Sequence, residues 1–101
     1  MSDWYLYIIR CRDNTLYTGI STDVDRRFSQ HQSEGYAGSR YLKGRGPLSL
    51  VFKEKLGSRS LALKAEHRVK KMTKARKEKL IKDQVWQLSS TYSATIRSKH
   101  R

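Results

Sequence analysis

The stretch WYLYII at residues 4–9, followed by LYTGI at residues 16–20, decides the fold of this chain. The first run is apolar or aromatic at every position, which is typical of a short strand covered on both faces. The residues Arg12-Asp13-Asn14 between the runs favour a turn, because Asp and Asn tolerate left-handed conformations and bond their own backbone. We therefore predict an antiparallel hairpin with a central first strand, and a second strand from which Gly19 releases the chain.

A helix is predicted next, over residues 23–32. Thr22 followed by Asp25 three positions later resembles a capping box, which marks a helix start. A loop rich in glycine is expected over residues 33–47, and a third strand over residues 48–52.

Two further helices complete the predicted order of strand, strand, helix, strand, helix, helix. Ser58 or Ser60 is suited to cap the first of them, and Thr73 the second, which we expect to be shorter. This order indicates an α/β (α+β) fold with a small three-stranded antiparallel sheet flanked by helices. With 101 residues, we predict one domain over residues 1–86 and a basic, frayed tail over residues 87–101.

The charge of the chain points to a polyanionic partner. Its 22 Lys and Arg residues outnumber 9 Asp and Glu residues and give a net charge of +13. Nucleic acid is the first candidate. A membrane surface is disfavoured, because no segment supplies a clear basic amphipathic helix and no apolar run approaches the ~20 residues that span a bilayer. The single cysteine, Cys11, fits a reducing cytoplasm.

Two tyrosines, an arginine and a histidine form the candidate catalytic set. Tyr7 and Tyr17 would lie on neighbouring strands, and Arg27 and His31, four residues apart, would project from one face of the predicted helix. Phenols near a cation, a guanidinium fork and an imidazole suit phosphate chemistry. Each residue taken alone is more simply a strand aromatic or a surface side chain. The helix pattern separates this catalytic face from the core face, and it points Arg26 about 100° away from Arg27.

Glu66 stands out because it is one of three glutamates among twelve Lys and Arg residues between Lys53 and Lys82. One interpretation is an ordinary ion pair with Lys70 at i+4. The other is a ligand to a single Mg²⁺ or Mn²⁺ ion whose remaining positions are filled by water.

The remaining basic residues are too dense for a balanced solvated face, and we predict that several bind phosphates of nucleic acid. These predicted nucleic-acid-binding residues are Arg26, Arg68, Lys70, Lys71, Lys74, Arg76 and Lys77.

The chain resembles the GIY-YIG nuclease superfamily, and most closely its small stand-alone bacterial members of the YhbQ/YazA type. Tyr5-Leu6-Tyr7 stands where the family has Gly-Ile-Tyr, and Tyr17-Thr18-Gly19 where it has Tyr-Ile-Gly. The resemblance covers residues 4–81 and implies DNA phosphodiester hydrolysis with one divalent metal ion. It departs from the family at Tyr5, which replaces the first glycine. Asn14, the only asparagine, lies far from the family's late active-site position.

The resemblance implies a role for each candidate. Tyr7 and Tyr17 take the two tyrosine positions, one of them as general base or water-orienting group. Arg27 occupies the position of the family's arginine that stabilises phosphoryl charge. His31 occupies that of a histidine found in homing endonucleases, and Glu66 that of the metal-binding glutamate.

Taken together, we expect an endonuclease of low sequence specificity, in the setting of DNA repair or recombination, with RNA not excluded as a substrate. Two alternatives stay open: a non-catalytic nucleic-acid-binding module of the same fold, and a nuclease subunit targeted by a partner protein. The natural substrate and the oligomeric state are not specified by the sequence.

Overall fold

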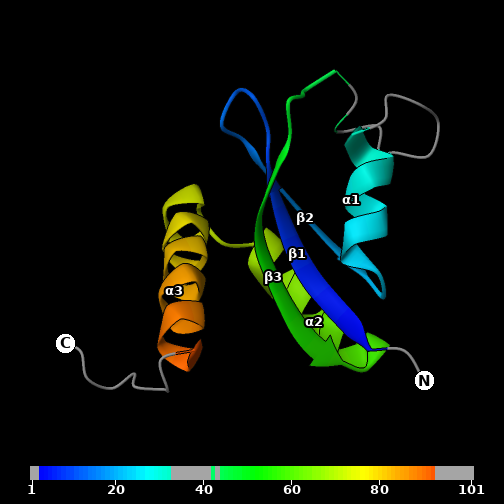
Figure 1. The fold of residues 1–101 in the computed structure, drawn as a ribbon, viewed down its shortest axis with the longest axis vertical. Coiled ribbons are helices and arrows are strands. Elements are labelled where there is room, and N and C mark those ends of the chain that lie inside the picture. Colours follow the sequence, from blue (N-terminus) through cyan, green and yellow to red (C-terminus); the bar gives the residue numbers. More distant parts are fainter. Residues whose placement is uncertain (1–2, 33–41, 43, 93–101) are drawn as a thin grey trace. The chain divides into compact units, whose positions relative to one another are not determined.

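A computed structural model of the chain describes residues 3–32, 42 and 44–92, with side chains described as far as Asp83. Its elements are β1 (Trp4–Arg10), β2 (Leu16–Ser21), α1 (Val24–Gln32), β3 (Ser49–Gly57), α2 (Arg59–Lys70) and α3 (Lys74–Tyr92) (Figure 1). The predicted order of strands and helices is confirmed. The chain divides into two compact units, residues 1–71 and residues 72–101, and α3 belongs to the second.

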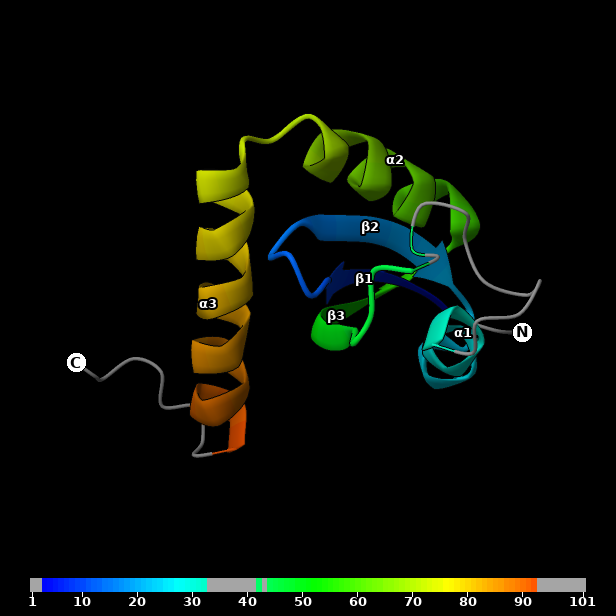
Figure 2. The ribbon, with the colours of Figure 1, turned by 90° about the horizontal axis from the view of Figure 1, so that it is seen from above.

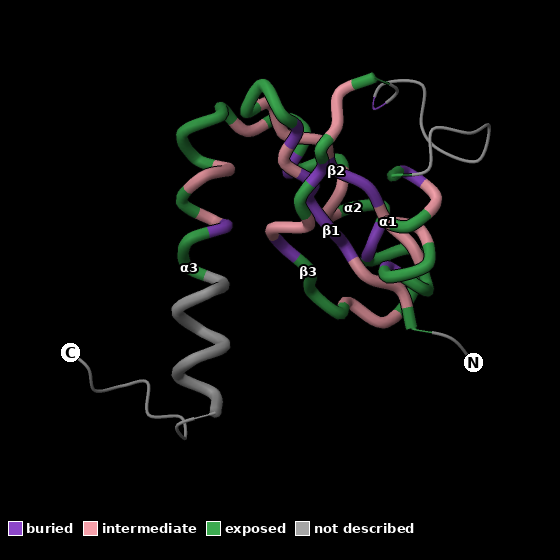
Figure 3. Tube along the Cα trace, turned by 45° about the horizontal axis from the view of Figure 1, so that its top comes forward, coloured by how far each residue is buried: buried purple, intermediate pink, exposed green. Residues whose placement is uncertain are grey.

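The sheet of the first unit is antiparallel and has the order β2-β1-β3. The predicted central position of β1 is therefore confirmed, and its residues from Leu6 to Ile9 are all buried (Figure 3). The predicted turn is also present, with Asn14 in a left-handed conformation at φ 73°. Asp13 Oδ1 accepts hydrogen bonds from the backbone N–H and the hydroxyl of Thr15.

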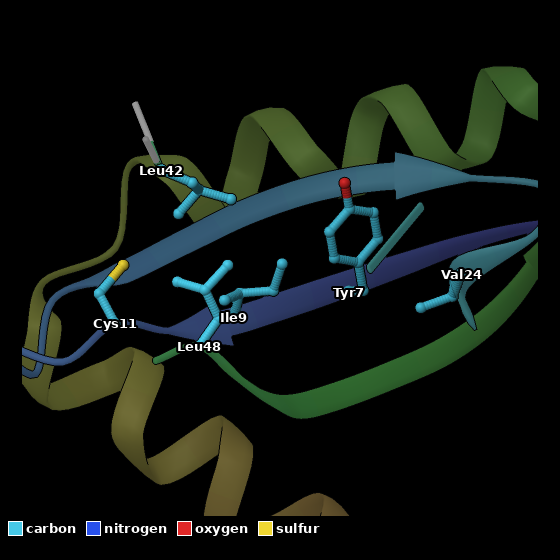
Figure 4. Close-up of a cluster of buried hydrophobic side chains, with 6 residues drawn as sticks. All are labelled: Tyr7, Ile9, Cys11, Val24, Leu42 and Leu48. Carbon is cyan, nitrogen blue, oxygen red and sulfur yellow. The ribbon is translucent and has the colours of Figure 1, made fainter. Parts of the chain in front are cut away.

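Helices lie on both sides of this sheet (Figure 2). α2 contacts all three strands, whereas α1 supplies Val24 and Phe28 to a cluster that contains Tyr7 and Ile9 of β1. Cys11, Leu42 and Leu48 complete the buried part of that cluster (Figure 4). Because successive strand side chains point to opposite faces, the odd-numbered residues of β1 face α1.

The strand ends differ from the prediction in two places. Gly19 does not release the chain, because β2 continues to Ser21 and Gly19 pairs with Tyr7. The third strand continues well past Phe52, to Gly57. The strand continues because β1 lies alongside it: Tyr7 pairs with Lys53 and Tyr5 with Lys55. The lysine side chains are exposed, and Lys53 lies 3.9 Å from an oxygen of Asp25 and Lys55 3.1 Å from one of Asp3.

Helix starts follow the capping rules with one change. Asp23, not Thr22, caps α1: its Oδ1 accepts from the backbone N–H of Arg26 at 3.1 Å. Ser58 caps α2 and Thr73 caps α3, as predicted.

The prediction of a short third helix is wrong, since α3 has 19 residues. Residues 74–92 contain neither Gly nor Pro, so no residue of the segment breaks a helix. The predicted tail from residue 87 therefore begins within α3, and residues 93–101 lie outside the described part of the chain. Most of the predicted loop, residues 33–41 and 43, also lies outside it. No helix of the described residues is long and apolar enough to cross a membrane.

Candidate active site

Tyr7 is the centre of the candidate site. It lies on the face of β1 that is covered by α1, is 2% exposed, and its hydroxyl is 3.0 Å from Nε2 of His31. Gly19 on β2 lies directly opposite, and a Cβ atom there would come within 2.5 Å of the Tyr7 hydroxyl oxygen. A larger residue at position 19 would therefore displace the Tyr7 ring. Glycine is required at this position for close approach, a role that the sequence pattern did not reveal.

Tyr17 and His31 complete an aromatic cluster around this hydroxyl. The Tyr17 ring centroid lies 6.5 Å from that of Tyr7 and 5.4 Å from that of His31, the latter contact edge-on. His31 is only 4% exposed. The prediction that the catalytic face of α1 is separate from its core face is therefore wrong for His31. Residues 24, 28 and 31 are close enough around a helix that the candidate base and the core side chains share one buried face.

Burial disfavours the charged forms of both Tyr7 and His31. It raises the pKa of Tyr7 to about 12, and the nearby Tyr17 adds to this increase. Burial also lowers the pKa of His31 to about 4, with a further contribution from the positive charge of Arg27. For this pair to accept a proton from water, one of these pKa values must change, or the two groups must move the proton together.

The low pKa of His31 predicts acid lability. At pH values between about 4 and 6.5 the unfolded chain binds a proton that folded His31 does not, so stability falls as pH falls through this window. The loss of stability should be complete near pH 4, where folded His31 itself begins to bind a proton. We expect denaturant unfolding of wild type to lose stability from pH 7 to 4 more steeply than that of His31→Gln.

His67→Gln is the matched control for this measurement, because His67 is exposed on α2. It should retain the wild-type pH dependence. Identical pH dependence in His31→Gln and wild type would contradict the assignment of a neutral, buried His31.

Arg27 lies at the edge of the aromatic cluster, half-buried on α1. Its guanidinium lowers the pKa of Tyr7 through hydrogen bonding and positive charge, although less than burial and Tyr17 raise it. Its Nη1 donates to Oε1 of Gln30 at 2.9 Å. Gln30 was not identified as a site residue from the sequence, although its position at i+3 from Arg27 is a recognisable signal for such a contact.

Glu66 reaches the site electrostatically from α2. Its charge contributes to the raised pKa of Tyr7, after burial and Tyr17. The ion pair with Lys70 is present, with Lys70 Nζ 3.3 Å from Glu66 Oε2. The side chain of Glu66 is 21% exposed and that of Lys70 is 56% exposed, so the lysine is the member of the pair that can turn outward to water.

The residues at the candidate site fit a hard cation that keeps most of its water ligands better than a cation enclosed by protein ligands. The described residues contain no group of three His, Cys, Asp or Glu side chains arranged around a metal position. A single carboxylate oxygen is nevertheless sufficient for Mg²⁺ or Mn²⁺, which keeps several waters and takes the remaining oxygens from substrate phosphates. Glu66 is the residue that would hold it.

The predicted nucleic-acid-binding residues are distributed over three places. Arg26 is exposed on α1, Arg68 and Lys70 are exposed on α2, and Lys71 follows α2 directly. Lys74, Arg76 and Lys77 lie in the first turn of α3, which belongs to the second unit.

The fold, the tyrosine pair and the site around them define the class of this chain. Residues 3–80 match the family model described as the GIY-YIG catalytic domain, so the chain belongs to the GIY-YIG family. Domains of this family are typically nucleases that use divalent metal ions and act on nucleic acid.

Two bacterial relatives are similar in sequence over most of this chain. It is 57% identical over 81 residues to the UPF0213 protein YhbQ of Escherichia coli strain K12, covering 80% of this chain and 79% of YhbQ. A UPF0213 protein of Cronobacter sakazakii is also 57% identical, with 83% of its length covered.

Two solution NMR structures resemble this one. The UPF0213 protein of Bacillus halodurans shares 40% identity at a TM-score of 0.52, covering 79% of this chain and 83% of that chain. A protein of E. faecalis shares 31% identity at a TM-score of 0.58, covering 100% of this chain and 96% of that chain.

Proposed function

We propose that this protein is a divalent-metal-dependent endonuclease that hydrolyses DNA phosphodiester bonds with low sequence specificity. The observation that carries the proposal is the buried hydrogen bond between Tyr7 and His31, with the positive charge of Arg27 close enough to lower the pKa of both groups. A binding module would need Arg27 to hold phosphate. It would have no use for a buried phenol–imidazole pair placed beside that arginine.

Arg27 would bind the scissile phosphate. Its planar fork matches two phosphoryl oxygens, and its positive charge stabilises the negative charge that develops on them in the transition state. The hydrogen bond to Gln30 holds the guanidinium in place while it does so.

Tyr7 and His31 would together accept the proton of the attacking water. A free phenolate is disfavoured, because the pKa of Tyr7 is about 12. If the Tyr7 hydroxyl passes its proton to His31 Nε2 as it receives one from water, no phenolate accumulates. A bound phosphate would also neutralise Arg27, whose charge lowers the pKa of His31, so substrate binding makes the imidazole a better base.

Glu66 would hold the Mg²⁺ or Mn²⁺ ion. When bound, such an ion supplies Lewis-acid stabilisation of phosphoryl and leaving-group oxygens. Lys70 would release the carboxylate and become available to the phosphate backbone. Tyr17, which meets His31 edge-on, keeps the imidazole in position.

Incubation with labelled DNA tests the proposal. Linear, branched and single-stranded DNA, and a matched RNA, would each be incubated with the full chain, with and without Mg²⁺ or Mn²⁺. We expect cleavage only with the ion. A preference for branched or damaged duplexes would favour a role in repair or recombination in the cytoplasm. Tight binding without cleavage of any substrate would favour the non-catalytic module, and cleavage only with an added protein would favour a targeted subunit.

Binding to duplex DNA should depend steeply on salt and little on sequence. Each phosphate contact contributes about −0.9 to the slope of log K against log salt. Replacing Arg68 and Lys71 together by Ala should therefore flatten the slope by about two units and weaken all sequences alike. Fluorescence anisotropy on two unrelated duplexes across a salt series measures this.

Arg12→Ala is the control for this series, since Arg12 is exposed in the β1–β2 turn, outside the predicted contact set. Lys70 is left intact because it pairs with Glu66. A strong preference for one duplex that survives high salt would contradict backbone recognition and indicate base readout.

A further inference from the structure

A polar cavity of about 230 Å³ opens beside the candidate active site, where the end of β2 meets α1. It shares Arg27 with the site, whereas neither Tyr7 nor His31 lines it. Its lining residues are Ser21, Thr22, Asp23, Arg26, Arg27 and Gln30.

The lining is built for an anion. Arg26 and Arg27 both reach this cavity, although the sequence pattern predicted that they point apart. Asp23 is the single carboxylate of the lining, and its Oδ1 accepts from the backbone N–H of Arg26. No salt bridge joins the Arg26 side chain to a carboxylate of the described residues. The two guanidinium groups and one carboxylate leave a net positive charge.

Size and position favour part of a polymer over a free small molecule. The volume is below the ~300–1,000 Å³ typical of small-molecule pockets. Because Arg27 borders both the cavity and the catalytic cluster, a group bound in the cavity is the immediate neighbour of a group bound at the Tyr7 hydroxyl. In a nucleic acid strand, the charged neighbour of one phosphate is the next phosphate along the backbone.

We infer that this cavity binds the phosphate adjacent to the scissile one, with Arg26 as its principal ligand. Thr22 and Ser21 supply hydroxyl donors, and Gln30 holds Arg27 between the two phosphates. This inference deepens the proposed nuclease function and rests on it for the identity of the polymer. Its consequence is that the site grips two consecutive phosphates and reads no base at this position.

Titrations of the ¹⁵N-labelled full chain with dinucleotides, followed by NMR without metal, test the inference. TpT carries one phosphate, whereas pTpT and TpTp carry a second phosphate on one side or the other. We expect the second phosphate on the correct side to strengthen binding about tenfold, as one charge-assisted contact does. The backbone amide signals of residues 21–30 should shift with it.

In the variant Arg26→Ala, the affinities for TpT and for the longer dinucleotide should differ by no more than about twofold, and TpT should still bind. Arg12→Ala should keep the tenfold gain. Retention of the gain in Arg26→Ala would overturn the inference. A difference in affinity between ApA and TpT that depends on Arg26 would also overturn it, because it would mean base readout. Equal affinity of wild type for TpT, pTpT and TpTp would overturn it as well. If the expected binding is seen but no DNA is cleaved with Mg²⁺ or Mn²⁺, the two-phosphate site stands and the proposed nuclease function fails.

Discussion

Arg27→Ala is expected to reduce metal-dependent DNA cleavage by about 100-fold or more, the loss typical of removing one group that stabilises transition-state charge. The side chain is half-buried at the edge of the aromatic cluster, where it donates a hydrogen bond to Gln30 and lowers the pKa of Tyr7. Its loss removes both the phosphate fork and the positive charge that lowers the pKa of Tyr7. Single-turnover cleavage of one labelled duplex with Mn²⁺ measures the effect.

Two variants separate these contributions. Arg27→Lys keeps the charge but loses the planar fork, and we expect it to recover only part of the rate. Arg12→Ala removes the same charge from the β1–β2 turn and should cleave like wild type. Circular dichroism and thermal unfolding would verify that all three variants fold. Full activity in folded Arg27→Ala would exclude Arg27 from the chemistry.

Glu66→Gln is expected to have a similarly large effect, through metal affinity. The amide has nearly the shape of the carboxylate but no charge to attract a hard cation. Cleavage should fall by about 100-fold or more at a fixed Mn²⁺ concentration, by the same reasoning as for loss of one transition-state charge contact. Part of the activity should return as the Mn²⁺ concentration is raised, and a titration of rate against Mn²⁺ for both proteins would show this.

The chain provides a closely matched control for this substitution. Glu78 also forms an i,i+4 ion pair, with Lys74 on α3 at 2.8 Å between Lys74 Nζ and Glu78 Oε2, although the lysine comes first there and the glutamate first in Glu66–Lys70. Glu78→Gln therefore also loses one helical salt bridge and one negative charge, and should leave both the rate and its Mn²⁺ dependence unchanged. An equal loss in both variants would mean that the effect of Glu66 comes from the ion pair and not from metal binding.

The local elements of the fold could be predicted because each has a local cause. The apolar run at residues 4–9 required a central strand, the Asp13-Asn14 turn required a hairpin, and Ser58 and Thr73 marked helix starts. The misjudged boundaries depended on partners distant in sequence. β3 extends past Phe52 because it pairs with β1 as far as Trp4, and no local pattern reveals this pairing.

The composition of the candidate site could be predicted, but its burial could not. Residue spacing placed Tyr7, Tyr17 and His31 near one another, and all three rings lie within 6.5 Å of each other, centroid to centroid. The spacing did not show that His31 turns inward to the core, because that depends on how α1 packs on the sheet. Gly19 looked like the end of a strand, whereas its lack of a side chain makes room for the Tyr7 ring.

The most direct test of the central claim is the single-turnover cleavage rate of Tyr7→Phe, compared with wild type and with Tyr5→Phe. The change removes the oxygen that is hydrogen-bonded to His31 and leaves the ring that fills the core. Tyr5→Phe makes the same change two residues earlier on the same face of β1 and should cleave normally.

We predict that Tyr7→Phe, shown to be folded by its amide NMR spectrum, loses cleavage by about 100-fold or more, in the range of general acid–base contributions. Wild-type cleavage by Tyr7→Phe would contradict the account, because the phenol between His31 and Arg27 would then have no part in the reaction.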